Sequence, residues 1–211
     1  MPENEGTSPS VPDALSPEVS LQEAQAKRHE QWVAQEGGME GPTHEETMAQ
    51  PCQQKRLEWL KARCKGTTSI LECGCNWGFV LDAVDGEVGL DINRENIKLA
   101  RQHFPKRCFE CWDISICLPY DDKSFDIVLL PDCLEHIPWA KVPIVLKEAM
   151  RTCRKKVLIT LPIDEEKATN FKHPWRPTQQ KINEIMAYFQ GTVVGNDGDF
   201  VYMEGLKCRQ C

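Results

Sequence analysis

The stretch "ILECGCNWGF" at residues 70–79 decides how the chain folds, because an apolar run ends in an acid and a short turn follows at once. Glycines stand at positions 74 and 78 of this turn, and Asn76 lies between them. Glycine, and less readily asparagine, accepts a left-handed backbone conformation. The turn therefore predicts a loop between a strand and a helix over which a ligand approaches the backbone closely. Which ligand it holds depends on the role of Glu72.

The sequence on either side of this stretch alternates between apolar runs and helical patterns. The runs predict strands at residues 68–73, 87–92, 107–112, 125–131 and 155–162. The helical patterns fall at residues 78–84, 93–103, 139–152 and 177–189. Strands that alternate with helices predict right-handed βαβ units and a doubly wound α/β fold with a mostly parallel sheet. Two short strands around "NDG" at 196–198 add a C-terminal antiparallel hairpin, which brings the sheet to seven strands.

The N-terminal part of the chain has a different composition. Residues 1–42 are rich in Pro, Glu, Ser and Gly, which predicts a disordered acidic arm that docks with a partner protein. The spacing of Ser20 and Glu23 is that of a capping box and predicts a short helix within the arm. Residues 43–211 form the folded domain. A second capping box, Thr43 with Glu46, predicts that its first helix runs from there to about Arg63.

The distribution of charge excludes several classes of function. Residues 1–50 contain ten acids and two bases, whereas residues 51–211 contain 22 acids and 23 bases, so the folded part is almost neutral. A domain without a basic surface is not expected to bind nucleic acid. No apolar run approaches the roughly 20 residues that span a bilayer. The N-terminus lacks the pattern of a secretory signal, so we expect a cytoplasmic protein whose eleven cysteines are reduced thiols.

Acids stand at or just after the carboxyl ends of four of the predicted strands. In a parallel sheet these strand ends share one edge, where doubly wound folds bind their ligands. The four acids are Glu72, Asp91, Asp113 and Asp132. Asp91 lies 19 residues after Glu72, close to the spacing at which an acid binds the ribose hydroxyls of a nucleotide. This spacing predicts a nucleoside ligand. We expect Asp91→Ala to weaken cofactor binding without changing the melting temperature of the ligand-free protein.

Glu72 restricts the choice of nucleoside. A dinucleotide places its diphosphate at the helix that follows the loop, where a carboxylate would repel it. The loop also lacks the G-x-G-x-x-G spacing of dinucleotide-binding proteins, which disfavours a nicotinamide-dependent oxidoreductase. A cofactor that presents a cation fits better. S-adenosylmethionine does so through its ammonium and sulfonium groups.

Five segments together resemble the successive motifs of class I S-adenosylmethionine-dependent methyltransferases, over residues 65–165. They are "ILECGCNWGF", "VGLDIN", "CWDIS", "LPYDDKSFDIVLLPDCLEHIP" and "VLITLP". The resemblance implies a Rossmann-like methyltransferase fold and S-adenosylmethionine as the cofactor. It implies that the first loop holds the methionine part, that Asp91 binds the ribose and that Asp113 meets the adenine amino group. The cofactor-binding residues implied are Glu72, Gly74, Cys75, Asn76, Gly78, Asp91, Ile92, Asp113, Ile114 and Asp132. Many family members have glycine where this chain has Asn76.

His136 is the candidate catalytic residue. It follows the fourth strand, at the mouth of the expected cofactor site, where it could act as a general base if the acceptor must lose a proton. Alternatively, its ring only orients the loop through a local hydrogen bond.

Two groups of residues suggest a metal. Asp132, Glu135 and His136 resemble the divalent-metal motif of some O-methyltransferases, and His173 could add a fourth ligand to a bound Mg²⁺. The pairs "CFEC" at 108–111 and "CRQC" at 208–211 suggest zinc, but residues three apart in a strand point to opposite faces. We therefore assign no metal ligand and expect activity to survive chelation.

The segment 168–181 between the fifth strand and the next helix is the candidate acceptor loop. It offers His173, Trp175 and Arg176 for binding the substrate, although Trp175 could instead cap the core. Trp77 could equally cover the methionine part or pack on a helix. These features predict transfer of a methyl group to a small-molecule acceptor. The alternative is a catalytically silent module that binds a partner through its acidic arm.

Overall fold

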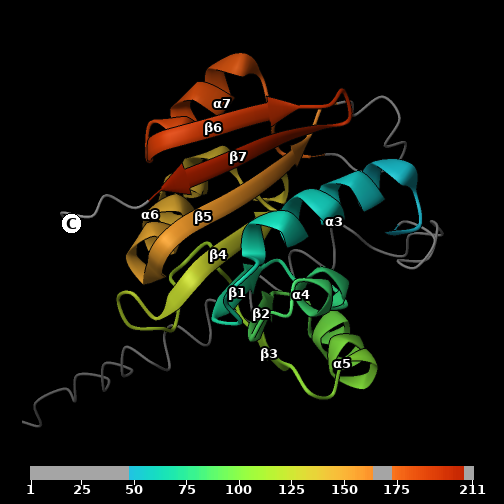
Figure 1. Ribbon diagram of the computed structural model, residues 1–211. Coiled ribbons are helices and arrows are strands. Elements are labelled where there is room, and N and C mark those ends of the chain that lie inside the picture. The colour runs from blue at the N-terminus through green and yellow to red at the C-terminus, as the bar shows by residue number, and fades with distance from the viewer. Residues whose placement is uncertain (1–47, 164–172, 207–211) are drawn as a thin grey trace, which may run out of the picture.

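The computed structural model describes residues 48–163 and 173–206, in which seven strands form one sheet (Figure 1). The order of the strands across the sheet is β3-β2-β1-β4-β5-β7-β6. The strands are β1 (Ile70–Cys73), β2 (Val88–Asp91), β3 (Cys108–Cys111), β4 (Phe125–Pro131), β5 (Cys153–Pro162), β6 (Gln190–Asn196) and β7 (Phe200–Leu206). The first five pair in parallel, while β7 is antiparallel to both β5 and β6. The predicted doubly wound sheet and its C-terminal hairpin are thus confirmed.

Helices cover both faces of the sheet. They are α3 (Pro51–Cys64), α4 (Phe79–Ala83), α5 (Arg94–His103), α6 (Val142–Thr152) and α7 (Gln179–Met186), with two 3-10 turns, η1 (Leu134–His136) and η2 (Trp139–Lys141). Apolar residues of α6 and α7 form one core with the sheet, and residues of α3 and α4 form another on the opposite face. Residues alternate between these cores along β4, because Val128 and Leu130 belong to the first and Ile127 and Leu129 to the second.

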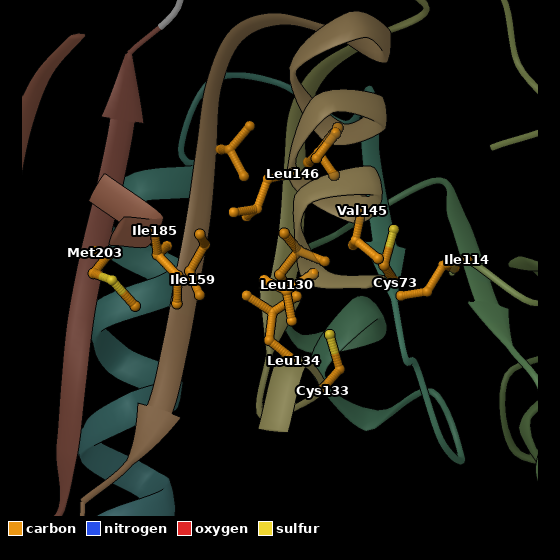
Figure 2. Close-up of a cluster of buried hydrophobic side chains, with 14 of the residues drawn as sticks. Cys73, Ile114, Leu130, Cys133, Leu134, Val145, Leu146, Ile159, Ile185 and Met203 are labelled. Carbon is orange, nitrogen blue, oxygen red and sulfur yellow. The ribbon is translucent and has the colours of Figure 1, made fainter. Parts of the chain in front are cut away.

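The core under α6 lies directly behind the carboxyl ends of the central strands. Figure 2 shows Val145 and Leu146 of α6 facing Leu130 of β4, with Cys73 and Cys133 nearby. Both cysteines are buried free thiols that pack as small apolar side chains. This packing fixes the ends of β1 and β4, from which functional residues extend.

The helix predicted from residue 43 to about Arg63 is interrupted at residues 49–50. Thr43, Glu46 and the whole arm of residues 1–42 lie outside the described residues, as do Ser20 and Glu23. Within the described part, α3 begins only at Pro51, after Gln50 in an extended conformation with a ψ of 142°. The reason is local, because a proline disfavours helical backbone in the residue before it and is well suited to the first turn. The helix expected to run unbroken from residue 43 is therefore wrong at residues 49–50.

In the two described ranges, no helix combines the length and the hydropathy that crossing a bilayer requires.

Candidate functional site

The four acids predicted at strand ends lie at the carboxyl edge of the sheet. β1 pairs in parallel with both β2 and β4, so the chain winds outward from β1 in two directions. Glu72 lies near the end of β1, Asp91 ends β2, Asp113 follows β3 and Asp132 follows β4. This is the switch point of a doubly wound sheet, where ligands bind in such folds.

The loop after β1 bends sharply over the end of β2. The backbone amides of Gly74 and Cys75 both donate to the carbonyl of Leu90, over 2.7 and 2.8 Å. Gly74, Asn76 and Gly78 all have left-handed conformations, with φ of 77°, 48° and 85°. The prediction that Asn76 takes a left-handed conformation is therefore confirmed.

The two glycines of this loop are also required by what lies beneath them. A Cβ atom at position 74 would lie 2.6 Å from the Cβ of Cys133. A Cβ atom at position 78 would lie 2.5 Å from the Phe109 ring. The sequence suggested that the glycines make room for a ligand, whereas these contacts show that they also allow the loop to pack on the protein.

Glu72 is almost completely buried, with 1% of its surface exposed. Its Oε2 atom has no hydrogen-bond partner within the described part of the chain, and the same is true of the Asn76 Oδ1 atom. Burial raises the pKa of Glu72 well above its ordinary value, while Arg56 and a hydrogen bond from the Leu81 backbone oppose the rise. A buried carboxyl group with an uncommitted oxygen is suited to bind a cationic hydrogen-bond donor.

Asp91 joins the loop to the start of α5. Its Oδ2 accepts from the Asn76 amide over 2.9 Å, and its Oδ1 accepts from the Asn93 amide over 2.8 Å. The Asn93 side chain in turn caps α5 by accepting from the Glu95 amide. Asp91 therefore has a structural role in addition to the ribose contact that the sequence predicted.

The residues expected around the nucleoside lie beside Asp91. Asp113 is buried, and its Oδ1 accepts from the Ser115 amide over 2.9 Å. Ile114 is buried next to it, and Ile92 is half-buried after β2. Because β2 and β3 pair in register up to Asp91 and Cys111, these side chains share one end of the sheet.

Trp77 packs on α5. Its indole Nε1 donates to Asn96 Oδ1 over 3.2 Å, and its ring stacks on His103 at a centroid distance of 6.0 Å. Of the two roles that the sequence left open, the structure supports packing and not a cover over the ligand.

Asp132 has both carboxylate oxygens engaged within the protein. Oδ2 lies 2.7 Å from Nη1 of Arg56, and Oδ1 accepts from the Thr160 hydroxyl over 2.7 Å. Its backbone is left-handed, with a φ of 48°. These bonds speak against the expected role of Asp132 in cofactor binding. Arg56 was missed, because nothing in the sequence marks a helical arginine as the partner of an acid 76 residues later.

Glu135, His136 and His173 come together beyond β4. One ligand atom from each of them lies within 4.8 Å of the other two, and the two imidazole rings meet edge to face at a centroid distance of 4.7 Å. Burial, aided by His173, lowers the pKa of His136 to about 4, so this ring is neutral at pH 7. Asp132 does not belong to this group of potential ligands.

The candidate acceptor loop is described from His173 onward. Trp175 is buried, and its indole Nε1 donates to the carbonyls of Leu134 and Ile137 over 3.1 and 2.9 Å. Of the two roles that the sequence left open for Trp175, the structure therefore supports that of a core residue and not a place on the substrate-facing surface. Arg176 is exposed, whereas His173 is half-buried beside His136.

The two C-x-x-C pairs do not form a described metal site. Cys108 is exposed on β3, and Cys111 is half-buried, with its thiol near the carbonyl of Ile92. Cys208 and Cys211 lie outside the described residues.

Comparison with known proteins shows which domain the chain resembles. Residues 71–161 match the family model described as "Methyltransferase domain". The uncharacterized protein MJ0638 of Methanocaldococcus jannaschii is 27% identical over 122 residues, which cover 55% of this chain and 52% of that protein. The chain thus spans about half the length of this curated relative.

Solved structures share the fold at low sequence identity. Magnesium protoporphyrin IX methyltransferase from Synechocystis PCC 6803, solved with bound S-adenosylmethionine, has a TM-score of 0.59 and 14% identity. That match covers 94% of this chain and 100% of that one. The N-methyltransferase NodS from Bradyrhizobium japonicum WM9, in complex with S-adenosylhomocysteine, has a TM-score of 0.63 and 12% identity, covering 85% and 97%. Residues 71–161 thus match the methyltransferase family model, and the fold of the domain is that of Rossmann-like methyltransferases.

Proposed function

We propose that the protein transfers the methyl group of S-adenosylmethionine to a small-molecule acceptor. The observation that carries the proposal is the buried carboxyl of Glu72, whose Oε2 is uncommitted among the described residues. It precedes a glycine loop that is hydrogen-bonded, through the Asn76 amide, to a second acid, Asp91, at the switch point of the sheet. A cationic nucleoside cofactor satisfies all three features.

The cofactor is proposed to lie along the carboxyl edge of the sheet. Its ammonium group meets Glu72, its ribose hydroxyls meet Asp91 and its adenine amino group meets Asp113. Each bond between a carboxylate and such a donor is worth roughly 1.5–3 kcal/mol. The proposed contacts are Glu72, Gly74, Cys75, Asn76 and Gly78 for the methionine part, Asp91 and Ile92 for the ribose, and Asp113 and Ile114 for the adenine. Asp132 is omitted because Arg56 and Thr160 engage its two oxygens.

The transfer itself is an in-line displacement. The acceptor atom forms a bond to the methyl carbon while the carbon–sulfur bond breaks, and S-adenosylhomocysteine leaves. The sulfonium already activates the methyl group, so the protein contributes mainly alignment, for which effective molarities correspond to up to roughly 7–11 kcal/mol. His136 is the proposed catalytic group at the acceptor side. Its neutral ring can either take a proton or hold a metal ion that acidifies the acceptor.

A small acceptor is favoured over a polymer by the charge of the folded part. Residues 51–211 carry almost balanced charges, whereas proteins that bind nucleic acid usually carry an excess of basic residues. The two solved structures of similar fold described above are named as a magnesium protoporphyrin IX methyltransferase and as the N-methyltransferase NodS. His173 and Arg176 are proposed to border the acceptor. Recruitment of a protein partner by residues 1–42 remains a separate proposal.

Two measurements test the function. Isothermal titration with S-adenosylmethionine, sinefungin and NADH should give binding of the first two and none of the third. Incubation with a pool of metabolites should then convert the cofactor to S-adenosylhomocysteine. Binding of NADH in preference to sinefungin would refute the assignment of the cofactor. Binding of S-adenosylmethionine without turnover on any pool would favour the silent binding module.

A further inference from the structure

We propose that Glu135, His136 and His173 bind a divalent transition-metal ion of the zinc type. The three donors come from two separate parts of the chain, the η1 turn and the segment before α7. One donor atom from each lies within 4.8 Å of the others. Zinc bonds of about 2.0–2.2 Å place tetrahedral donors roughly 3.5 Å apart, so that binding requires shifts of only about 1 Å.

The packing around the cluster holds the two parts of the chain together. The indole Nε1 of Trp175 donates to the carbonyls of both Leu134 and Ile137, which flank Glu135 and His136. Trp175 is itself buried, so these bonds are shielded from water. His173, two residues before it, is thereby kept against His136. The meeting of the histidines thus follows from core packing and not from a flexible surface loop.

The start of the η1 turn is fixed as well. The amide of Asp132 donates to the carbonyl of Thr160 on β5, and the Thr160 hydroxyl donates back to Asp132. Arg56 completes the surroundings of Asp132. The turn that carries Glu135 and His136 is therefore anchored to β5 at one end and to Trp175 at the other. Such support of the ligands by their surroundings is what distinguishes an organised metal site from a chance cluster.

The donor set determines the kind of metal. Two imidazole nitrogens and one carboxylate oxygen suit zinc and neighbouring transition metals, whereas Mg²⁺ prefers oxygen ligands. Glu135 is 1% exposed, and a buried carboxylate is stabilised by a cation. Among the described residues the site has three protein ligands, the number that catalytic zinc sites use together with one open position. The ion proposed here thus differs from the Mg²⁺ considered from the sequence, and Asp132 is not among its ligands.

The open position gives the metal a role that rests on the proposed function. A hydroxyl group of the acceptor that binds there becomes more acidic and releases its proton to solvent. The resulting oxygen attacks the methyl carbon, the carbon–sulfur bond breaks and its electron pair stays on sulfur. The acceptor is therefore a hydroxyl-bearing small molecule, and its methylation requires the metal. This replaces the expectation that activity survives chelation.

The site is tested by cobalt binding, which does not depend on activity. Chelator-treated full-length protein is titrated with Co²⁺, whose visible absorption reports ligand geometry, and then with Zn²⁺ or Mg²⁺ as competitor. We expect one equivalent of Co²⁺, displaced by Zn²⁺ and not by Mg²⁺. His173→Ala and Glu135→Gln should each weaken binding roughly hundredfold or more. A Cys108→Ser, Cys211→Ser double variant, which disrupts both C-x-x-C pairs, should bind like the wild type.

Equal Co²⁺ affinity in the wild type, His173→Ala and Glu135→Gln would overturn the site, as would loss of binding only in the cysteine variant. Circular dichroism identifies a variant that fails to fold, and the second ligand variant then decides. Calorimetry with S-adenosylmethionine separates the two proposals. Uptake of the cofactor by a protein that binds no Co²⁺ refutes the metal site alone. Metal binding without cofactor uptake refutes the proposed function alone.

Discussion

Arg56 and Asp132 form an ion pair across the fold, with 2.7 Å between Nη1 and Oδ2, in which Arg56 is buried and Asp132 half-buried. Arg56 comes from α3, which lies across the face of the sheet, and Asp132 follows β4 (Figure 1). Arg56 also lowers the pKa of Glu72 against the effect of burial. Arg56 of α3 thus influences two acids, Glu72 and Asp132, at the carboxyl edge of the sheet.

Replacement of Arg56 by methionine should destabilise the protein strongly. The substitution leaves the half-buried Asp132 carboxylate without its cation, which costs up to about 3–5 kcal/mol, the value for fully buried pairs. Urea unfolding measures the loss. Lys98→Met is the matched control, because its partner Glu95 is exposed and such pairs contribute about 0–1 kcal/mol. An Arg56→Met, Asp132→Asn double variant should recover part of the loss. Equal stability of the Arg56 and Lys98 variants would contradict this role of the ion pair.

Substitution of Glu72 by glutamine should separate affinity from stability. Folding raises the pKa of Glu72. Ionisation of this carboxyl therefore lowers the free energy of unfolding once the pH exceeds the pKa that Glu72 has in the unfolded chain. Glutamine resembles the protonated acid, so the ligand-free variant should melt a few degrees higher than the wild type, about 2–4 °C per kcal/mol, at pH 8 and not at pH 4. Its affinity for S-adenosylmethionine should fall at least about tenfold, because the ammonium loses its charged partner.

The same linkage predicts that binding of S-adenosylmethionine releases protons. A cation favours the ionised form of Glu72, so affinity should rise with pH until the carboxyl of the free protein is fully ionised. Calorimetry in two buffers of different ionisation enthalpy counts the protons. The Glu72→Gln variant should release fewer. If both proteins released the same number, Glu72 would not be the titrating group.

Replacement of Asp91 by alanine should now reduce both affinity and stability. The sequence alone predicts an unchanged melting temperature, but Asp91 accepts hydrogen bonds from the amides of Asn76 and Asn93. Removal of the carboxylate leaves the amides of Asn76 and Asn93, both partly buried, without their hydrogen-bond acceptor, at a cost of about 1–3 kcal/mol each. Thermal unfolding of the ligand-free variant checks this. An unchanged melting temperature would show that these hydrogen bonds contribute little.

Gly78→Ala should destabilise the protein more than Gly66→Ala. Both positions have positive φ, 85° and 90°, so alanine strains the backbone at each by roughly 1–2 kcal/mol. Only position 78 adds a collision, with Phe109, whereas nothing lies within 4 Å of a Cβ at position 66. Overpacking of this kind costs about 1–3 kcal/mol more. Phe109→Leu should relieve part of the excess, and equal losses from both glycine variants would exclude the collision.

The sequence predicts best what depends on local pattern. The strands were located to within about two residues, because continuous apolar runs such as "FDIVLLP" define a strand buried on both faces. The left-handed Asn76 was predicted for the same reason, since the loop demands it locally. The prediction of one unbroken helix up to Arg63 is wrong because Pro51 sets a helix boundary by sterics, whereas the capping box at Thr43 lies outside the described residues.

Contacts between distant segments were not accessible from the sequence. The sequence leaves open whether Trp175 faces the acceptor or caps the core, and its indole reaches two carbonyls some 40 residues earlier in the chain. Arg56 carries no mark of its pairing with Asp132. The sequence indicates His173 as a possible partner of His136, but the same motif also includes Asp132. Tertiary packing alone decides which of these side chains meet.

The position of Arg56 sets a limit on how this protein can be shortened. The segment that matches the family model, residues 71–161, contains almost all of the motif residues quoted above, but Arg56 precedes it. A truncated version that began at residue 66 would keep Glu72 and Asp132 and discard the guanidinium that moderates both. Reduction to the recognisable motifs would therefore remove the counter-ion on which their acids rely.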